Sequence, residues 1–290
     1  MSGGMTQSSR RAESTCHSRS MHGFAKSDNQ YKSTDVRLVP IEHVRLHERY
    51  DPKRVKSLKE DLLTSGILRD PPIAAMHAGR TIILDGATRT TALREIGAKQ
   101  IVVQVVQYAQ PQVMLDCWYH IVQGVSANQL DEAITIATGV SGVQQDISIL
   151  QRTRAAGQYS FALLSREGYG YIYPLDPERE TVCMVLNQVF DTYAKRFKVI
   201  RMTPSEAQTQ TTGGPGHACI VAYPRFTPAE ILRMGSHGCK LPAGITRHIV
   251  NGRVTNLMVP LDTLINPDPM MTSEVDYRPR RSGHRSRAPC

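Results

Sequence analysis

The stretch that decides the fold is residues 81–97, with the sequence TIILDGATRTTALREIG. Its apolar, β-branched start predicts a buried strand, and Asp85-Gly86 predicts a sharp turn. A helix-forming segment follows at once and ends at Gly97. A strand that turns directly into a helix leaves the first helical N–H groups unpaired, at the positive end of the helix dipole. We therefore expect an anion site here, with Arg89 adding a fixed charge, although a plain strand–turn–helix has the same pattern.

Hydrophobic periodicity predicts the elements on either side of this stretch. A helix carries Val55, Leu58, Leu62 and Leu63 and is closed by Gly66. The strands of this part are predicted at 37–41, 44–46, 71–76, 81–84 and 101–106, with a hairpin turn at 77–80. Together they form a mixed unit of about 75 residues, a usual size for a small domain.

The pattern after residue 110 is less regular. Residues 128–156 and 178–197 are predicted to be helical, and residues 227–234 begin with the spacing of a capping box. Residues 245–250 and 254–259 alternate around Asn251-Gly252, which predicts a β-hairpin.

The composition indicates a soluble globular protein with two tails. We expect disordered tails at 1–34 and 268–290, a first domain at 35–110 and a second domain at 111–267. The tails supply +3 and +2 of the net charge of +9, so the body carries only +4, which suits a phosphorylated ligand better than a DNA groove. No apolar run spans a membrane, and six cysteines without framework spacing indicate a reducing, cytoplasmic setting.

Three motifs in the first domain occur in the order found in the ParB/sulfiredoxin superfamily, which the chain resembles. They are Leu-His-Glu-x-x-x-Pro at 46–52, Gly-Ile-Leu-x-x-Pro-Pro-Ile at 66–73 and Asp-Gly-x-x-Arg at 85–89. Within that superfamily, the span of about 35–265 resembles the free L-serine kinases, including those of siderophore biosynthesis. The additional motifs are Trp118-x-His120, Pro-Ala-Gly-Ile-Thr-Arg at 242–247 and Asn-Leu-Met-Val-Pro-Leu at 256–261.

This resemblance implies an α+β fold. A ParB/sulfiredoxin-like nucleotide-binding domain would pack on a mixed α/β domain, with the active site in the cleft between them. The implied reaction transfers a phosphoryl group from ATP or ADP to the hydroxyl of free L-serine and gives O-phospho-L-serine. In related siderophore pathways this product feeds the synthesis of 2,3-diaminopropionate. The oligomeric state stays open.

The resemblance also assigns roles to residues. Glu48 matches the catalytic glutamate and would orient or deprotonate the substrate hydroxyl. Asp85 would lie close to the transferred group and either hold Mg²⁺ or share the base role, and the sequence does not divide these two tasks. The residues expected to cradle the nucleotide phosphates are Gly86, Ala87, Thr88, Arg89 and Thr90.

On the substrate side, Arg247 would pair with the serine carboxylate and Thr246 would donate a hydrogen bond. Trp118 and His120 would form a wall of the pocket. Each assignment has a structural alternative: Glu48 as a surface loop residue, Trp118 as core, and Arg247 on a solvated strand face.

Two features distinguish this chain from its superfamily. Related kinases commonly have histidine where Thr88 stands, and threonine can donate to a phosphate but cannot relay a proton near neutrality. Sulfiredoxin chemistry needs a cysteine where Ala87 stands. A ParB-like, nucleotide-dependent DNA-binding or regulatory protein is the alternative function, but the motifs after residue 117 favour the kinase.

One further cluster of residues suggests a metal. His217-x-Cys219 and His237-x-Cys239 offer four nitrogen and sulfur ligands of the kind that bind zinc. Structural zinc pairs usually have two or more residues between the ligands, so the spacing does not favour this interpretation.

Overall fold

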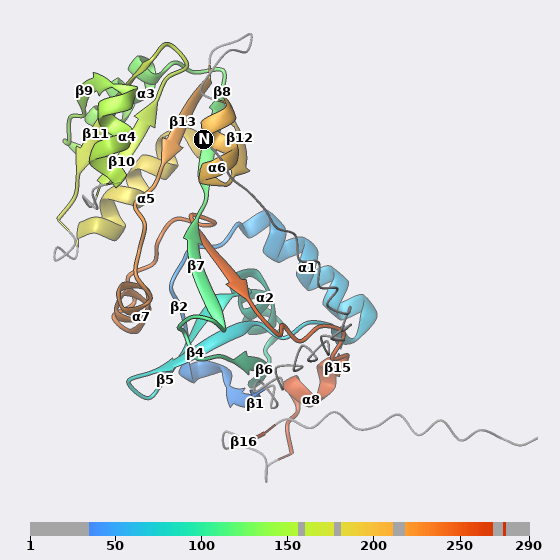
Figure 1. Ribbon diagram of the computed structural model, residues 1–290. Coiled ribbons are helices and arrows are strands. Elements are labelled where there is room, and N and C mark those ends of the chain that lie inside the picture. The colour runs from blue at the N-terminus through green and yellow to red at the C-terminus, as the bar shows by residue number, and fades with distance from the viewer. Residues whose placement is uncertain (1–34, 156–159, 177–180, 211–217, 269–274, 277–290) are drawn as a thin grey trace, which may run out of the picture. The chain divides into compact units, whose positions relative to one another are not determined.

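The computed structural model describes residues 35–155, 160–176, 181–210, 218–268 and 275–276, which belong to one unit that begins at Ser33. Two six-stranded sheets with helices packed against them dominate this part of the chain (Figure 1). The mixed α/β fold agrees with the prediction. Among the described residues, no helix has the length and apolarity needed to span a membrane.

The first sheet holds the motifs of the predicted first domain. Its strand order is β16-β1-β6-β4-β5-β2. Strand β2 runs parallel to β5, whereas β4 and β5 form the predicted antiparallel hairpin. The strands are β1 (Asp35–Pro40), β2 (Val44–Leu46), β4 (Ile73–His77), β5 (Arg80–Asp85), β6 (Gln100–Val105) and β16 (Val275–Asp276).

Helices α1 (Pro52–Ser65), α2 (Ala87–Ile96) and α8 (Leu261–Ile265) share one apolar cluster with this sheet. Asp51 caps α1 by accepting from the Lys53 N–H, and Gly66 ends the helix with φ 65°, as the sequence predicted. A short 3-10 helix, Ile41–His43, joins β1 to β2.

The second sheet has the order β12-β8-β13-β10-β11-β9. Its strands are β8 (Tyr119–Gln123), β9 (Val143–Asp146), β10 (Ser160–Leu164), β11 (Tyr169–Pro174), β12 (Lys198–Met202) and β13 (Ala218–Ala222). Residues of α3 (Ala127–Thr138) and α5 (Thr181–Ala194) join the apolar cluster on one face, and residues of α4 (Ile147–Ala155) and α6 (Pro204–Gln210) join the cluster on the other.

Helix α7 (Pro228–Ser236) connects the two sheets through the larger apolar cluster. Its N-cap is Thr227, and Glu230 completes the capping box that the sequence predicted. Gly235 lies so close to β5 that an added Cβ atom would stand 2.6 Å from the Ile82 side chain. The helix therefore packs tightly against the sheet that carries the Asp85 motif.

Two sequence predictions are corrected. Residues 128–156 are not one helix, because strand β9 separates α3 from α4 and pairs with β11. Residues 245–250 and 254–259 do not form a hairpin: β14 (Thr246–Val250) pairs with β7 (Val113–Cys117), and β15 (Val259–Pro260) pairs with β3 (Ile67–Leu68). The chain turns at Asn251-Gly252 but continues to another partner.

The pairing of β15 with β3 brings the last described part of the chain back to the elements around the first sheet. From β15 onward the polypeptide returns to the first domain, where α8 packs and β16 pairs with β1 (Figure 1). Strand β16 falls inside the segment 268–290, which was expected to be a disordered tail. Residues 1–34 and most of 268–290 lie outside the described residues.

Candidate active site

The parallel strands β2 and β5 carry the two predicted catalytic carboxylates to one edge of the first sheet. Leu46 is in register with Ile83, and Glu48 and Asp85 each follow two residues later. Neighbouring strands lie about 4.8 Å apart, so the two segments leave the sheet from adjacent positions. Glu48 and Asp85 therefore follow the carboxyl ends of adjacent parallel strands.

Glu48 is bound to the Pro-Ala-Gly-Ile-Thr-Arg segment rather than free on the surface. Its Oε2 accepts from the backbone N–H of Gly244 at 3.1 Å and from the Thr246 hydroxyl at 3.3 Å. Around it, the Arg49 N–H donates to the Leu241 carbonyl, and the Leu241 N–H donates to the His47 carbonyl. These bonds hold the two segments together across almost 200 residues of sequence.

His47 was not singled out from the sequence, although it lies in the Leu-His-Glu motif. Its side chain is buried, with Nδ1 2.6 Å from the Ile83 carbonyl and Nε2 2.9 Å from the Thr246 hydroxyl. Because a carbonyl only accepts, Nδ1 carries the proton of the first bond. His47 thus links the end of β5 to the residue that contacts Glu48.

The turn after β5 has the backbone that an anion site needs. Gly86 caps α2 with φ 106°, and no side chain caps this helix end. A Cβ atom at Gly86 would stand 2.8 Å from the Cβ of Pro72, so only glycine fits. Thr90, predicted to bind phosphate, is fully buried and donates to the Gly86 carbonyl at 3.1 Å. Its hydroxyl therefore stabilises the turn.

The guanidinium group of Arg89 is hydrogen-bonded to neighbouring protein groups. Its Nη1 donates to the carbonyls of Asp70 (2.9 Å) and Pro71 (3.2 Å), and its Nη2 donates to the Asp85 carboxylate (3.2 Å). Burial lowers the pKa of Arg89, while the charge of Asp70 raises it. Arginine stays protonated in proteins, so the side chain places a fixed positive charge beside the turn.

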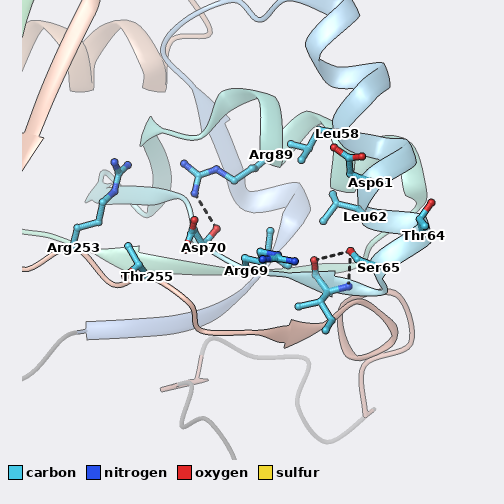
Figure 2. A pocket seen from close by; sticks show the side chains of 12 residues that line it. Leu58, Asp61, Leu62, Thr64, Ser65, Arg69, Asp70, Arg89, Arg253 and Thr255 are labelled. Atoms are coloured by element: carbon cyan, nitrogen blue, oxygen red, sulfur yellow. Dashed lines mark hydrogen bonds between the residues drawn. The ribbon is translucent and has the colours of Figure 1, made fainter.

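A pocket of about 700 Å³ opens next to Arg89 (Figure 2). It is lined by the C-terminal half of α1, by β3 and by the segment after β14, with Arg89, Arg253 and Asp70 at one end. Ligand pockets commonly measure about 300–1,000 Å³, so this one is large enough for a nucleotide. Arg253 also contacts the Asp85 carboxylate.

Trp118 and Arg247, the residues predicted to bind the substrate, contact each other where β7 pairs with β14. The Arg247 guanidinium lies over the Trp118 ring, 5.0 Å from its centroid, and Nη1 is 3.3 Å from the Asp116 carboxylate. The backbone N–H of Trp118 donates to the Ile245 carbonyl. Both side chains are half-buried.

His120 does not have the position expected of a pocket wall. It is fully buried, with Nδ1 2.7 Å from the Tyr193 hydroxyl and Nε2 3.3 Å from the Gly244 carbonyl. Burial lowers its pKa to about 4. A neutral His120 therefore stabilises the turn at Gly244 through the contact of its Nε2 atom with the Gly244 carbonyl. Arg201 was also not foreseen: it packs against the α-carbon of Gly244 and donates to the Ala243 carbonyl at 3.3 Å.

The described members of the cysteine and histidine pairs are not arranged as metal ligands. Cys239 is joined to Cys183 by a disulfide, which the sequence analysis did not anticipate, and Cys219 is fully buried. His217 lies outside the described residues. Within the part of the chain that the structure describes, no group of three or more His, Cys, Asp or Glu side chains could hold a metal ion.

The chain is similar in sequence to known L-serine kinases. The chain is 26% identical to the ATP-dependent L-serine kinase SbnI of Staphylococcus aureus over 235 residues. This match covers 80% of this chain and 85% of that protein. It is 22% identical to the ADP-dependent L-serine kinase SerK of Thermococcus kodakarensis, over 82% of this chain and 97% of that protein. No protein-family model matches the chain.

The solved structures decide the fold. A free serine kinase in complex with AMP superposes with a TM-score of 0.66 at 20% identity, covering 82% of this chain and 97% of that one. The chain has the free serine kinase fold. This is the fold that the motifs led us to expect, and the match covers most of the chain.

Proposed function

We propose that the protein is a kinase that transfers a phosphoryl group from ATP or ADP to free L-serine and forms O-phospho-L-serine. One observation carries the proposal: Glu48 is hydrogen-bonded to Gly244 and Thr246 at the edge of the sheet where β5 ends in the Asp85–Arg89 turn. The similarity to L-serine kinases over most of the chain supports it.

In the proposed reaction Glu48 is the general base. The serine Oγ atom attacks the terminal phosphorus, the bond from that phosphorus to the nucleotide oxygen breaks, and the hydroxyl proton passes to the Glu48 carboxylate. The bonds from Gly244 and Thr246 fix Oε2 and leave Oε1 for the substrate. A positioned general base contributes about 10²–10⁴ in rate.

The nucleotide would bind in the pocket next to Arg89, which α1, β3 and the segment after β14 line. Its phosphates would meet the N–H groups of Ala87, Thr88 and Arg89 at the N-terminus of α2. Thr88 can donate one hydrogen bond there but cannot act as an acid or base near pH 7. The turn geometry at Gly86 and the Asp-Gly-x-x-Arg motif support these proposed roles.

The residues present fit Mg²⁺ carried by the nucleotide. Asp85 is a half-exposed carboxylate at the mouth of the turn. Proteins commonly hold Mg²⁺ through one or two carboxylates and substrate phosphates, and a single aspartate meets that need. When bound, the ion neutralises charge on the phosphates; Asp85 would hold it in place.

The serine substrate would lie between Glu48 and Arg247. Asp116 and Trp118 fix the Arg247 guanidinium from two sides, so its fork can receive the substrate carboxylate in one orientation. A site that hydrogen-bonds this group rejects analogues that lack it. The product would then serve a reaction that displaces phosphate from the β-carbon, as in 2,3-diaminopropionate synthesis for siderophores.

The test is direct. The purified chain is incubated with Mg²⁺, ATP or ADP, and L-serine, L-homoserine or L-threonine, and phosphorylated products are identified by mass spectrometry. We expect phosphoserine with at least one nucleotide and far less of it with the Glu48→Gln variant. Absence of product with both nucleotides would contradict the proposal, and CTP-dependent binding to duplex DNA would then favour a ParB-like regulatory protein.

A further inference from the structure

Arg253 reaches the site from a segment that no motif marks. The chain turns at Asn251-Gly252 after β14, and Gln104 of β6 then holds it on both sides of Arg253. The buried Gln104 side chain donates through Nε2 to the Gly252 carbonyl at 2.9 Å and accepts from the Val254 N–H at 2.8 Å. The backbone of Arg253 is therefore fixed to the first sheet, while its side chain extends into the pocket.

The side chain of Arg253 is directed at the Asp85–Arg89 turn. Its Nη2 contacts the Asp85 carboxylate, which also accepts from Arg89, so two arginines flank one aspartate. Arg253, Arg89 and Asp70 lie at the same end of the pocket (Figure 2). The two guanidinium groups bring several N–H donors to this end, beside the carboxylates of Asp70 and Asp85, and such donors suit the oxygens of a phosphorylated ligand.

The two arginines differ in how they are held. Arg89 also donates to two backbone carbonyls and its side chain is 21% exposed, whereas that of Arg253 is 40% exposed and contacts Asp85. A half-exposed arginine on a surface ion pair loses little when it changes partner, because solvent screens such a pair and it contributes little to stability. Arg253 is thus the guanidinium that can move.

We propose that Arg253 binds the phosphates beyond the first, exchanging the Asp85 carboxylate for a phosphate of the entering nucleotide. This inference rests on the proposed function, because it assumes a nucleotide in the pocket. A guanidinium pairs with two phosphate oxygens at once, and a phosphate carries more charge than a carboxylate. The exchange also releases Asp85 toward the transferred group. Arg253 is therefore a specificity residue for the length of the phosphate chain.

The affinity of AMP, ADP and ATP for the full chain tests this proposal, measured by isothermal titration calorimetry without divalent metal. For Arg253→Gln we expect ADP and ATP to bind about 10- to 100-fold more weakly, as for loss of a hydrogen bond to a charged group, with AMP affinity unchanged. Arg253→Lys should recover part of the loss, since it keeps the charge but not the fork. Arg80→Gln, at the opposite end of β5, is the control with the same charge change.

Other outcomes overturn the inference. An Arg253→Gln protein that binds all three nucleotides like the wild type, or that loses affinity for all three by the same factor, shows that Arg253 does not recognise the outer phosphates. Thermal unfolding of each variant separates such a uniform loss from misfolding. A wild-type chain that binds no nucleotide overturns the inference and the proposed function together, whereas wild-type binding and phosphoserine formation with an unchanged variant overturn the inference alone.

Discussion

Replacing Thr246 by valine tests whether the contact that holds Glu48 matters for turnover. The substitution keeps the shape of a buried side chain and removes a hydroxyl that lies 3.3 Å from Glu48 Oε2 and 2.9 Å from His47 Nε2. A hydrogen bond to a charged group contributes about 1.5–3 kcal/mol, so we expect kcat/KM for serine to fall about 10- to 100-fold. His47 keeps a buried nitrogen without its partner, which costs about 1–3 kcal/mol of unfolding free energy.

The assay is steady-state phosphoserine formation, with urea unfolding measured on the same preparations. Thr246→Ser keeps the hydroxyl and is the matched control, which should retain most of the activity. Wild-type kcat/KM in Thr246→Val would refute the reasoning, because Glu48 would then need no bond from β14. A loss of stability with unchanged turnover would separate the contact to His47 from the contact to Glu48.

Three further predictions concern the substrate side, the disulfide and the buried histidine. Trp118→Ala removes the ring under Arg247 and should raise the KM for serine about 5- to 30-fold while nucleotide affinity is unchanged, since cation–π contacts contribute about 1–2 kcal/mol; equal effects on both substrates would contradict this. Reducing the Cys183–Cys239 disulfide, which spans 56 residues, should lower the unfolding free energy by up to about 4 kcal/mol in urea titrations with and without reductant, and Cys183→Ser should abolish the difference between the two conditions. The pKa of His120 is lowered to about 4, so the unfolded chain takes up this proton first as the pH falls; the stability contribution is complete above about pH 6.5 and is lost down to about pH 4. Thermal unfolding should show this decline, and His120→Gln should make it shallower.

The local elements of the first domain could be predicted from the sequence because their signals are local. Gly66, Gly86 and Gly97 mark helix ends with positive φ, and the Asp85-Gly86 turn joins β5 to α2 as expected. Long-range pairing could not be predicted in the same way. The turn at Asn251-Gly252 indicated a hairpin, but the alternation of β14 is satisfied equally well by β7, and only tertiary packing decides between the two partners.

The site shows the same division between local and distant information. The turn with the expected anion site can be predicted from residues 85–89 alone. The hydrogen bond between Thr246 and Glu48, in contrast, joins residues 198 positions apart. Only the family resemblance suggested that these two residues lie in one site. His47 could have been found from its place beside Glu48. His120 could not be distinguished from a pocket residue, because a histidine in an alternating strand carries no sign of which face is buried.

The most direct test of the account compares Glu48→Gln with the wild type in two measurements on one preparation: the rate of phosphoserine formation at saturating serine and nucleotide, and the affinity for the nucleotide. The account predicts that kcat falls about 10²- to 10⁴-fold while nucleotide affinity stays the same, because the amide keeps the shape and accepts no proton. A Glu48→Gln enzyme that turns over like the wild type would contradict it.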